Sequence, residues 1–518
     1  MNFYNEMNKT QDLNTRKLTE NGAVGHSTTG HYLLDLNFAI SSLRNKSAKE
    51  IYEMFSKAYD ENPVYAMRWL FYARDVRGGV GERRLFRLVM LNLISDKPNL
   101  VKALLTLIPE YGRWDDMISL IGINNTLDKA VFKIAHDQLM SDMYNMKENK
   151  SISLLAKWLP SINTSSSESV NLAHKFRRNF GMDERTYRKT LSALRKYIDI
   201  VEAKMSAQDW NEINYEAVPS RANLIYKDAF LKHDEDRRKV YLDSLKKGEA
   251  KINAGTLFPH DIVHKINDSH GWSNSFKYDE TAEQLWKNLP DYVKGNGSTL
   301  VVADGSGSMC STIGGTQISA WEVAHALATY FAERASGVFK DNYITFSSRP
   351  QFVNLNGTSL MDNMKIAAKH NECADTNIEA VFDLILSTAV RTHCSQKDLP
   401  DNILVISDME FNACVSCNRP GGRYSYTRNL PPTLFDVIAD KYRSAGYVMP
   451  KLCFWNVNSR TGTIPVTQNE MGVALVSGFS PAVVKMVLSN KTDPYEALIE
   501  TIMDKRYDPV GKIALNYT

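Results

Sequence analysis

Length, composition and charge place this chain among ordinary globular proteins. It has 518 residues, 43% hydrophobic and 23% charged, with a net charge of +3, which excludes a disordered, collagen-like or coiled-coil chain. No stretch approaches the 18 uninterrupted apolar residues of a membrane span, and the polar start, residues 1–6, lacks the apolar core of a signal peptide. We therefore expect two or more domains, no membrane partner and a cytoplasmic location.

The N-terminal half is predicted to be helical. Residues 1–24 are polar and irregular, so we expect a flexible or docked arm. From about residue 30 to 265, apolar residues recur at helical spacing, as in 65–74 and 84–94. Successive helix pairs without an exact repeat are typical of an α-solenoid of HEAT-like character. We assign residues 25–295 to this all-α domain.

A Gly-rich loop at residues 77–81 is surrounded by arginines. It lacks the Gly-Lys-Ser/Thr ending of a phosphate-binding P-loop. We interpret it as a tight helix–helix turn whose arginines pair with Asp75, Glu82 or Asp115, and phosphate binding is the alternative.

A basic segment at residues 174–197 is the candidate RNA-binding surface. Its cations are Lys175, Arg177, Arg178, Arg185, Arg188, Lys189, Arg195 and Lys196. Arg188 and Arg195 are seven residues apart, as are Lys189 and Lys196, so each pair lies along one helix face. A cationic stripe attracts phosphates in a salt-dependent way, and Tyr187 and Tyr197 offer stacking surfaces for unpaired bases. A solvated helix face with salt bridges to acidic neighbours is the alternative.

The pattern changes at a Gly/Asn/Ser segment, residues 294–298, where we place the main domain boundary. Strands are predicted at 299–303, 342–347, 403–407, 449–457 and 473–477, and helices at 316–335, 359–369, 378–390, 433–445 and 481–489. This alternation predicts a doubly wound parallel α/β sheet over residues 296–518. The fold class is therefore α + α/β.

Oxygen-bearing side chains follow two of the predicted strands. Asp304, Ser306 and Ser308 alternate with glycines directly after the strand at 299–303, and Asp408 ends the strand at 403–407. Thr376 precedes the helix that starts near residue 378. Ligands of parallel sheets sit at the carboxyl ends of strands, and oxygen ligands suit Mg²⁺. We predict a site for Mg²⁺ or another divalent cation here; a strand-end loop without a ligand is the alternative.

This Asp-x-Ser-x-Ser, Thr and Asp series resembles the metal-ion-dependent adhesion site of von Willebrand factor A (vWA) domains. The resemblance implies that Ser306, Ser308 and Thr376 bind the metal directly or through water, and that Asp304 and Asp408 bind it largely through water. It also implies that an acidic side chain, from a partner or from this chain, completes the shell. Many vWA domains have Gly before the Thr, where this sequence has Asp375.

Further phrases of the sequence resemble the TROVE family, which contains the Ro autoantigen. They are residues 73–84, 111–116, 186–196 and 251–260. The similarity is greater to an uncharacterised group of TROVE-like, vWA-containing proteins from microbes, plants and phages, of which residues 407–411 are also typical. The resemblance implies a ring of helical repeats closed by a vWA domain, with small or misfolded RNA as the partner.

The remaining motifs add little chemistry. Cys414 and Cys417 form a lone C-x-x-C, interpreted as free thiols; zinc, with Cys373, Cys394 or His393, is the alternative. No G-x-S-x-G, H-E-x-x-H or P-loop motif is present, so we predict that the protein is not an enzyme.

The predicted function is that of an RNA-binding TROVE-like protein with a Mg²⁺-dependent vWA docking site for an acidic residue of a protein partner, and no DNA partner. One alternative is an interaction or assembly module without RNA, such as a phage or virion component. The other is a hydrolase.

Overall fold

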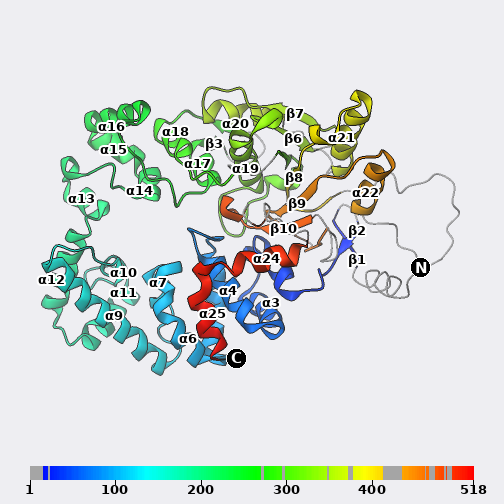
Figure 1. The fold of residues 1–518 in the computed structure, drawn as a ribbon. Helices are drawn as coiled ribbons and strands as arrows, with labels where there is room; N and C mark the ends of the chain where they lie inside the picture. The colour runs from blue at the N-terminus through cyan, green and yellow to red at the C-terminus, as the bar shows by residue number, and fades with distance from the viewer. Residues whose placement is uncertain are drawn as a thin grey trace. The chain divides into compact units, whose positions relative to one another are not determined.

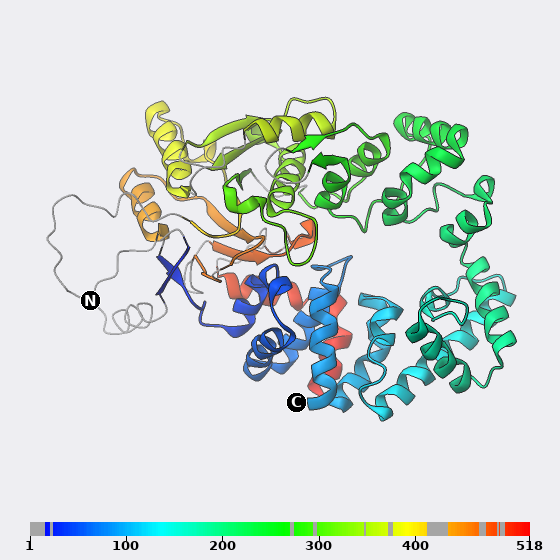
Figure 2. The same cartoon turned by 180° about the vertical axis from the view of Figure 1, so that it is seen from behind.

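The chain is a mixed α/β protein in which a helix-rich N-terminal region precedes a mostly parallel sheet (Figures 1 and 2). The computed structural model describes residues 16–20, 24–269, 274–293, 298–346, 349–370, 377–411, 434–460, 462–465, 473–483, 486 and 493–517. The chain packs into two compact units. We call Met1–Ala66 with Leu257–Asp504 the sheet unit, and Met67–Thr256 with Lys505–Thr518 the helical unit.

The helical unit is built from short helices, as the apolar spacing predicts. The helix α4 (Pro63–Arg74) leads into it, and the others are α5 (Arg83–Asp96), α6 (Pro98–Leu104), α7 (Ile108–Tyr111), α8 (Trp114–Ile118), α9 (Asn125–Lys147), α10 (Leu155–Trp158), α11 (Ser167–Asn179), α12 (Glu184–Tyr197), α13 (Val201–Ala207), α14 (Ser220–Ile225), α15 (Lys227–His233), α16 (Glu235–Lys247) and α25 (Asp508–Leu515). Asn124, Ser166 and Asp183 accept backbone N–H bonds at the starts of α9, α11 and α12, which satisfies donors that a helix leaves unpaired.

The helices α9 to α12 lie together (Figure 1) and share one apolar core. Phe132 of α9 meets Phe176 of α11 edge to face, with ring centroids 4.9 Å apart. Leu191 and Leu194 bury the predicted apolar stripe of α12 in the same core. The cations of α12 consequently lie on its other faces.

The Gly-rich loop is a structural turn whose neighbouring arginines bind carboxylates, as interpreted from the sequence. A Cβ on Gly79 would lie 1.9 Å from the Tyr72 carbonyl oxygen, so only glycine fits there. Arg87 binds Asp115 at 2.7 Å, which confirms the predicted acidic partner. Asp75 instead binds Arg506, from the end of the chain.

Asp116 is the centre of this network, and sequence reasoning missed it. It is fully buried and accepts from Arg74 Nη2 and Arg87 Nε, each at 2.6 Å. The backbone N–H of Arg113 also donates to it, at 3.0 Å. The carboxylate therefore neutralises cations that the fold has removed from water.

Asp116→Ala should destabilise the protein by about 3–5 kcal/mol, because it leaves the buried Arg74 guanidinium without its counter-charge. The measurement is the free energy of unfolding from urea denaturation followed by circular dichroism. Glu235→Ala is the control, since it removes an exposed carboxylate that pairs with Lys239, and it should change stability little. Equal losses for the two variants would contradict the structural role of Asp116.

The sheet unit contains a six-stranded sheet in the order β10-β9-β8-β5-β6-β7. Its strands are β5 (Thr299–Asp304), β6 (Asn342–Phe346), β7 (Gln351–Asn354), β8 (Asn402–Ser407), β9 (Lys451–Asn456) and β10 (Val473–Ser477). All five predicted strands are present and parallel. The strand β7, which was not predicted, pairs antiparallel with β6. Every residue of β5 is buried, so this strand is covered on both faces, as in parallel sheets flanked by helices.

Helices surround this sheet. They are α2 (Tyr32–Phe38), α3 (Ala48–Glu61), α17 (Pro259–Ile266), α18 (Glu280–Lys287), α19 (Ala320–Arg334), α20 (Leu360–Lys369), α21 (Ile378–Thr392), α22 (Leu434–Ser444) and α24 (Pro494–Ile502). The predicted helices at 316–335, 359–369, 378–390 and 433–445 correspond to α19 to α22. Of the helix predicted at 481–489, the structure describes a 3-10 turn, Pro481–Val483, and most of the rest lies outside the described residues.

Some helices of the N-terminal half belong to the sheet unit. The helix α2 contacts β10, and α17 contacts α19. The compact units therefore divide the chain differently from the boundary predicted near residue 295. In the described part of the arm, β1 (Arg16–Leu18) and β2 (Val24–His26) form an antiparallel pair. No helix among the described residues is long and apolar enough to cross a membrane.

Candidate metal centre and basic groove

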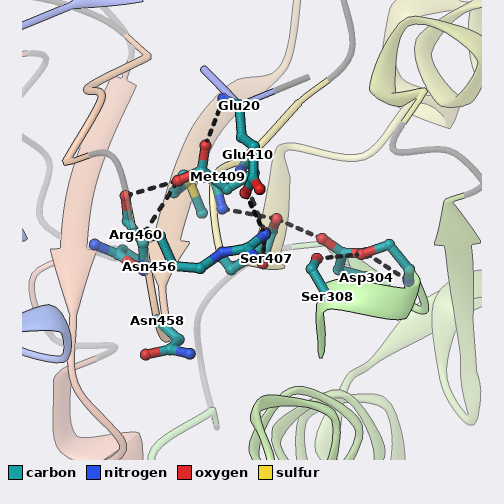
Figure 3. Close-up of polar contacts among 12 residues, drawn as sticks. Glu20, Asp304, Ser308, Ser407, Met409, Glu410, Asn456, Asn458 and Arg460 are labelled. Atoms are coloured by element: carbon teal, nitrogen blue, oxygen red, sulfur yellow. Dashed lines mark hydrogen bonds and ion pairs between the residues drawn. The ribbon is translucent and has the colours of Figure 1, made fainter. Parts of the chain in front are cut away.

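The ends of β5 and β8 bring the predicted metal ligands together. These strands are parallel neighbours, with Ala303 opposite Ile406, so Asp304 and Ser407 follow side by side at one edge. The Ser407 hydroxyl donates to Asp304 Oδ2 at 2.6 Å (Figure 3). The register of the sheet thus places Asp408 beside the loop that follows Asp304.

The loop after β5 turns its hydroxyls toward the same place. The backbone N–H of Ser306 donates to Asp304 Oδ1 at 2.8 Å. The Ser306 and Ser308 hydroxyl oxygens lie 3.0 Å apart, and the Ser308 hydroxyl is close enough to Asp408 to act against the rise in the pKa of that carboxyl. Asp304, Ser306, Ser308 and Asp408, four of the five predicted ligands, therefore converge.

The fifth predicted ligand, Thr376, lies outside the described residues, as does Asp375. The described chain resumes at Asn377, whose side chain accepts from the Ala380 N–H and caps α21. Cys373, Cys414 and Cys417 also lie outside the described residues, while Cys394 is a free thiol.

The electrostatics of this edge suit a cation. Asp304 and Asp408 are almost completely buried. Burial, followed by the facing charge of Asp408, raises the pKa of Asp304 to about 7, and burial likewise raises the pKa of Asp408. A divalent cation would offset both carboxylates, and carboxylate and hydroxyl oxygens are donors that Mg²⁺ accepts. The donor set fits the metal that the vWA resemblance implies.

Ser407 and Met409 are features of this site that sequence reasoning missed. Met409 has φ 65°, in the left-handed region that is uncommon outside glycine. This turn lets the Glu410 N–H donate to Asp408 Oδ1 at 3.3 Å. Among the described residues, no three His, Cys, Asp or Glu side chains form a metal-binding group, so a cation here depends on the serine hydroxyls.

A second candidate site is a basic groove of about 1070 Å³ in the helical unit. It lies along α12, between residues 161–163 and α13. We call it the basic groove. Its charged lining residues are the six cations Arg185, Arg188, Lys189, Arg195, Lys196 and Lys204 and the three acidic residues Asp199, Asp209 and Glu212. The structure therefore gathers five of the eight predicted RNA-binding residues.

The groove's cations are largely available to a ligand. Arg185, Arg188, Lys189 and Lys196 are exposed. Within residues 155–215, all of which the structure describes, the ion pairs join Lys157 to Glu202, His174 to Glu184 and Lys204 to Asp199, and none uses these four cations. These four cations are therefore solvated and carry none of the salt bridges expected in the alternative interpretation of this helix face.

Arg195 has a different role from the one predicted. Its guanidinium donates to the carbonyl oxygens of Ala156 at 2.8 Å and Leu159 at 2.7 Å, and to Ser161 Oγ at 2.8 Å. Burial lowers its pKa. Arg195 therefore ties α12 to the segment that forms the opposite wall, and its charge lies in that wall.

The other three predicted cations, Lys175, Arg177 and Arg178, lie on α11 and do not line the groove. Arg177 is half-buried and donates to the Met182 carbonyl at 3.3 Å. Arg178 donates to the His174 carbonyl at 3.1 Å.

The predicted stacking role of Tyr187 is wrong. This side chain is 1% exposed, and its hydroxyl donates to the Pro160 carbonyl at 2.9 Å. It belongs to the core because it shares the apolar face of α12 with Leu191 and Leu194. Tyr197 is 36% exposed, so it alone of the two presents a ring surface.

Comparison with known families finds two models along this chain, and neither assigns an activity. Residues 298–510 match a model described as a domain of unknown function (DUF7788). Residues 19–123 and 165–299 match a second, also a domain of unknown function (DUF2828). The border between the models is close to the domain boundary predicted near residue 295. The chain is also 27% identical over 533 residues to the uncharacterized protein L728 of Acanthamoeba polyphaga mimivirus, covering 95% of this chain and 88% of the viral protein.

Proposed function

We propose that this protein binds small or misfolded RNA through the basic groove, as a TROVE-like protein. The observation that carries the proposal is the row of exposed cations without acidic partners along α12. In this proposal the helices form a HEAT-like TROVE domain and the sheet is a vWA domain, and no catalytic role is assigned.

The dimensions of the groove suit a short run of phosphates. The 14 residues of α12 span about 21 Å, and Arg185, Lys189 and Lys196 are spread over that length. Such cations bind the phosphate backbone by displacing counterions, whatever the base sequence. Preference for RNA over DNA rests on the resemblance to TROVE proteins.

Co-purifying nucleic acid tests this proposal. We expect the freshly purified protein to show an absorbance ratio at 260 and 280 nm above that of protein alone, and ribonuclease to lower it. A ratio that deoxyribonuclease lowers and ribonuclease does not would contradict RNA as the partner. A ratio equal to that of protein alone would favour an assembly module without RNA.

A second function is favoured by the convergence at the sheet edge: cation-dependent docking of an acidic side chain. Asp304, Ser306, Ser308 and Asp408 would hold Mg²⁺, with Thr376 as the further ligand implied by the vWA resemblance. The bound ion would supply an electrophilic position for a carboxylate oxygen of a protein partner. Calorimetric titration of the full chain with MgCl2 tests this function, and absence of binding would contradict it.

A further inference from the structure

Residues 19 and 20, which follow the strand β1, are anchored beside the candidate metal centre. The Thr19 hydroxyl donates to the Phe411 carbonyl at 2.6 Å. The Glu20 N–H donates to Glu410 Oε2 at 2.9 Å. Further along, the backbones of His26 and Ile464 exchange hydrogen bonds of 2.7 and 2.8 Å. These contacts hold the backbone of residues 19 and 20 at the edge where β8 ends.

Arg460 lies between Glu20 and the candidate metal centre. Its Nη2 lies 2.7 Å from Glu20 Oε2 (Figure 3) and 3.7 Å from Asp408 Oδ2. Its backbone N–H donates to Glu410 Oε1 at 3.1 Å. The side chain of Arg460 is 42% exposed and that of Glu20 52%, whereas that of Asp408 is 2% exposed. A solvent-facing guanidinium thus stands next to a buried carboxylate of the candidate site.

We propose that Arg460 is the anion-recognition residue of the metal edge, and that Glu20 occupies it until an acidic side chain of a protein partner displaces it. This inference rests on the proposed cation-dependent docking. A guanidinium binds a carboxylate through parallel N–H bonds, so a carboxylate that approaches the cation also finds Arg460. The carboxylate of Glu20 already pairs with Arg460, and its negative charge repels a second carboxylate that approaches the same guanidinium.

The exposed position of the Glu20–Arg460 pair makes it replaceable. Solvent-exposed ion pairs contribute little and are screened by salt, so a ligand that also contacts the cation can compete with Glu20. Exchange needs only a side-chain rotation, because the hydrogen bonds that hold Thr19, Glu20 and His26 in place do not use the Glu20 side chain. Glu20 therefore lowers the affinity of this edge for acidic ligands without preventing their binding.

The test uses a fluorescein-labelled hexaglutamate peptide and the full chain, with binding followed by anisotropy in MgCl2 and in EDTA. Glu20→Gln should tighten the Mg²⁺-dependent binding about two- to fivefold. Arg460→Gln should weaken it by at least as much. Glu53→Gln is the matched control, because Glu53 is exposed in the same unit and pairs with Lys49; it should leave binding unchanged.

The outcomes separate this inference from the docking function. Mg²⁺-dependent peptide binding that Glu20→Gln and Arg460→Gln leave unchanged would overturn the inference and retain the docking site. If neither the wild type nor Glu20→Gln binds the peptide in a Mg²⁺-dependent way, the docking function fails, and the inference fails with it.

Discussion

Replacing Arg185, Arg188, Lys189 and Lys196 together by glutamine will lower the affinity for single-stranded RNA by about a hundredfold at moderate salt. These are the exposed cations of the basic groove. Each lost phosphate contact also removes about 0.7 from the slope of log affinity against log salt concentration, so the slope should fall by about three. Fluorescence anisotropy over a series of salt concentrations measures both quantities.

The control for this variant carries the same change of charge elsewhere in the helical unit. Lys133, Lys147, Lys175 and Arg178 are exposed and lie outside the groove. Their replacement by glutamine should reduce affinity only modestly, through the long-range field of the protein. Equal losses for the two quadruple variants would show that total charge, and not the groove, determines binding. Arg195 stays unchanged in both because its guanidinium holds the groove wall.

Asp304→Asn will lower the affinity for Mg²⁺ about 10- to 100-fold, the range found when an outer-shell partner of a metal is lost. Without metal, the variant should be at least as stable as the wild type, since it removes one of two buried carboxylates that face each other. The wild type should gain thermal stability with MgCl2 by mass action, and the variant should not. Calorimetry gives the affinity and differential scanning fluorimetry the stability.

A lower affinity for Mg²⁺ together with an undiminished stability in the absence of metal distinguishes a metal ligand from a residue needed only for folding. A variant that is less stable in EDTA than the wild type would indicate a purely structural carboxylate. Asp383→Asn is the control, because Asp383 is exposed in the same unit and pairs with Lys441. It should keep the stabilisation by MgCl2.

The strand positions and the convergence of Asp304 with Asp408 were predictable from sequence. A buried parallel strand is an uninterrupted apolar run, and the residue that follows it lies at a known edge of the sheet. The strand β7 was missed because this edge strand is short, and Phe352 within it faces solvent. The vWA and TROVE resemblances stay predictions about finer features of the fold.

What the sequence did not reveal depends on contacts between distant segments. The spacing of Arg188 and Arg195 correctly placed them on one helix face, but it could not show that carbonyl groups of residues 156 and 159 surround Arg195. The aromatic character of Tyr187 suggested stacking, whereas its place in the apolar stripe decided its burial. Glu20 and Arg460 are 440 positions apart in the sequence, and no local pattern connects them.

The most direct test of the RNA-binding function is crosslinking of the protein in its native host, followed by sequencing of the bound RNA. We expect a discrete set of small or end-exposed RNAs with the wild type. We also expect that replacing Arg185, Arg188, Lys189 and Lys196 by glutamine reduces the recovery of these RNAs strongly. RNA at background level with the wild type, or equal recovery with the groove variant, would contradict RNA binding through this groove.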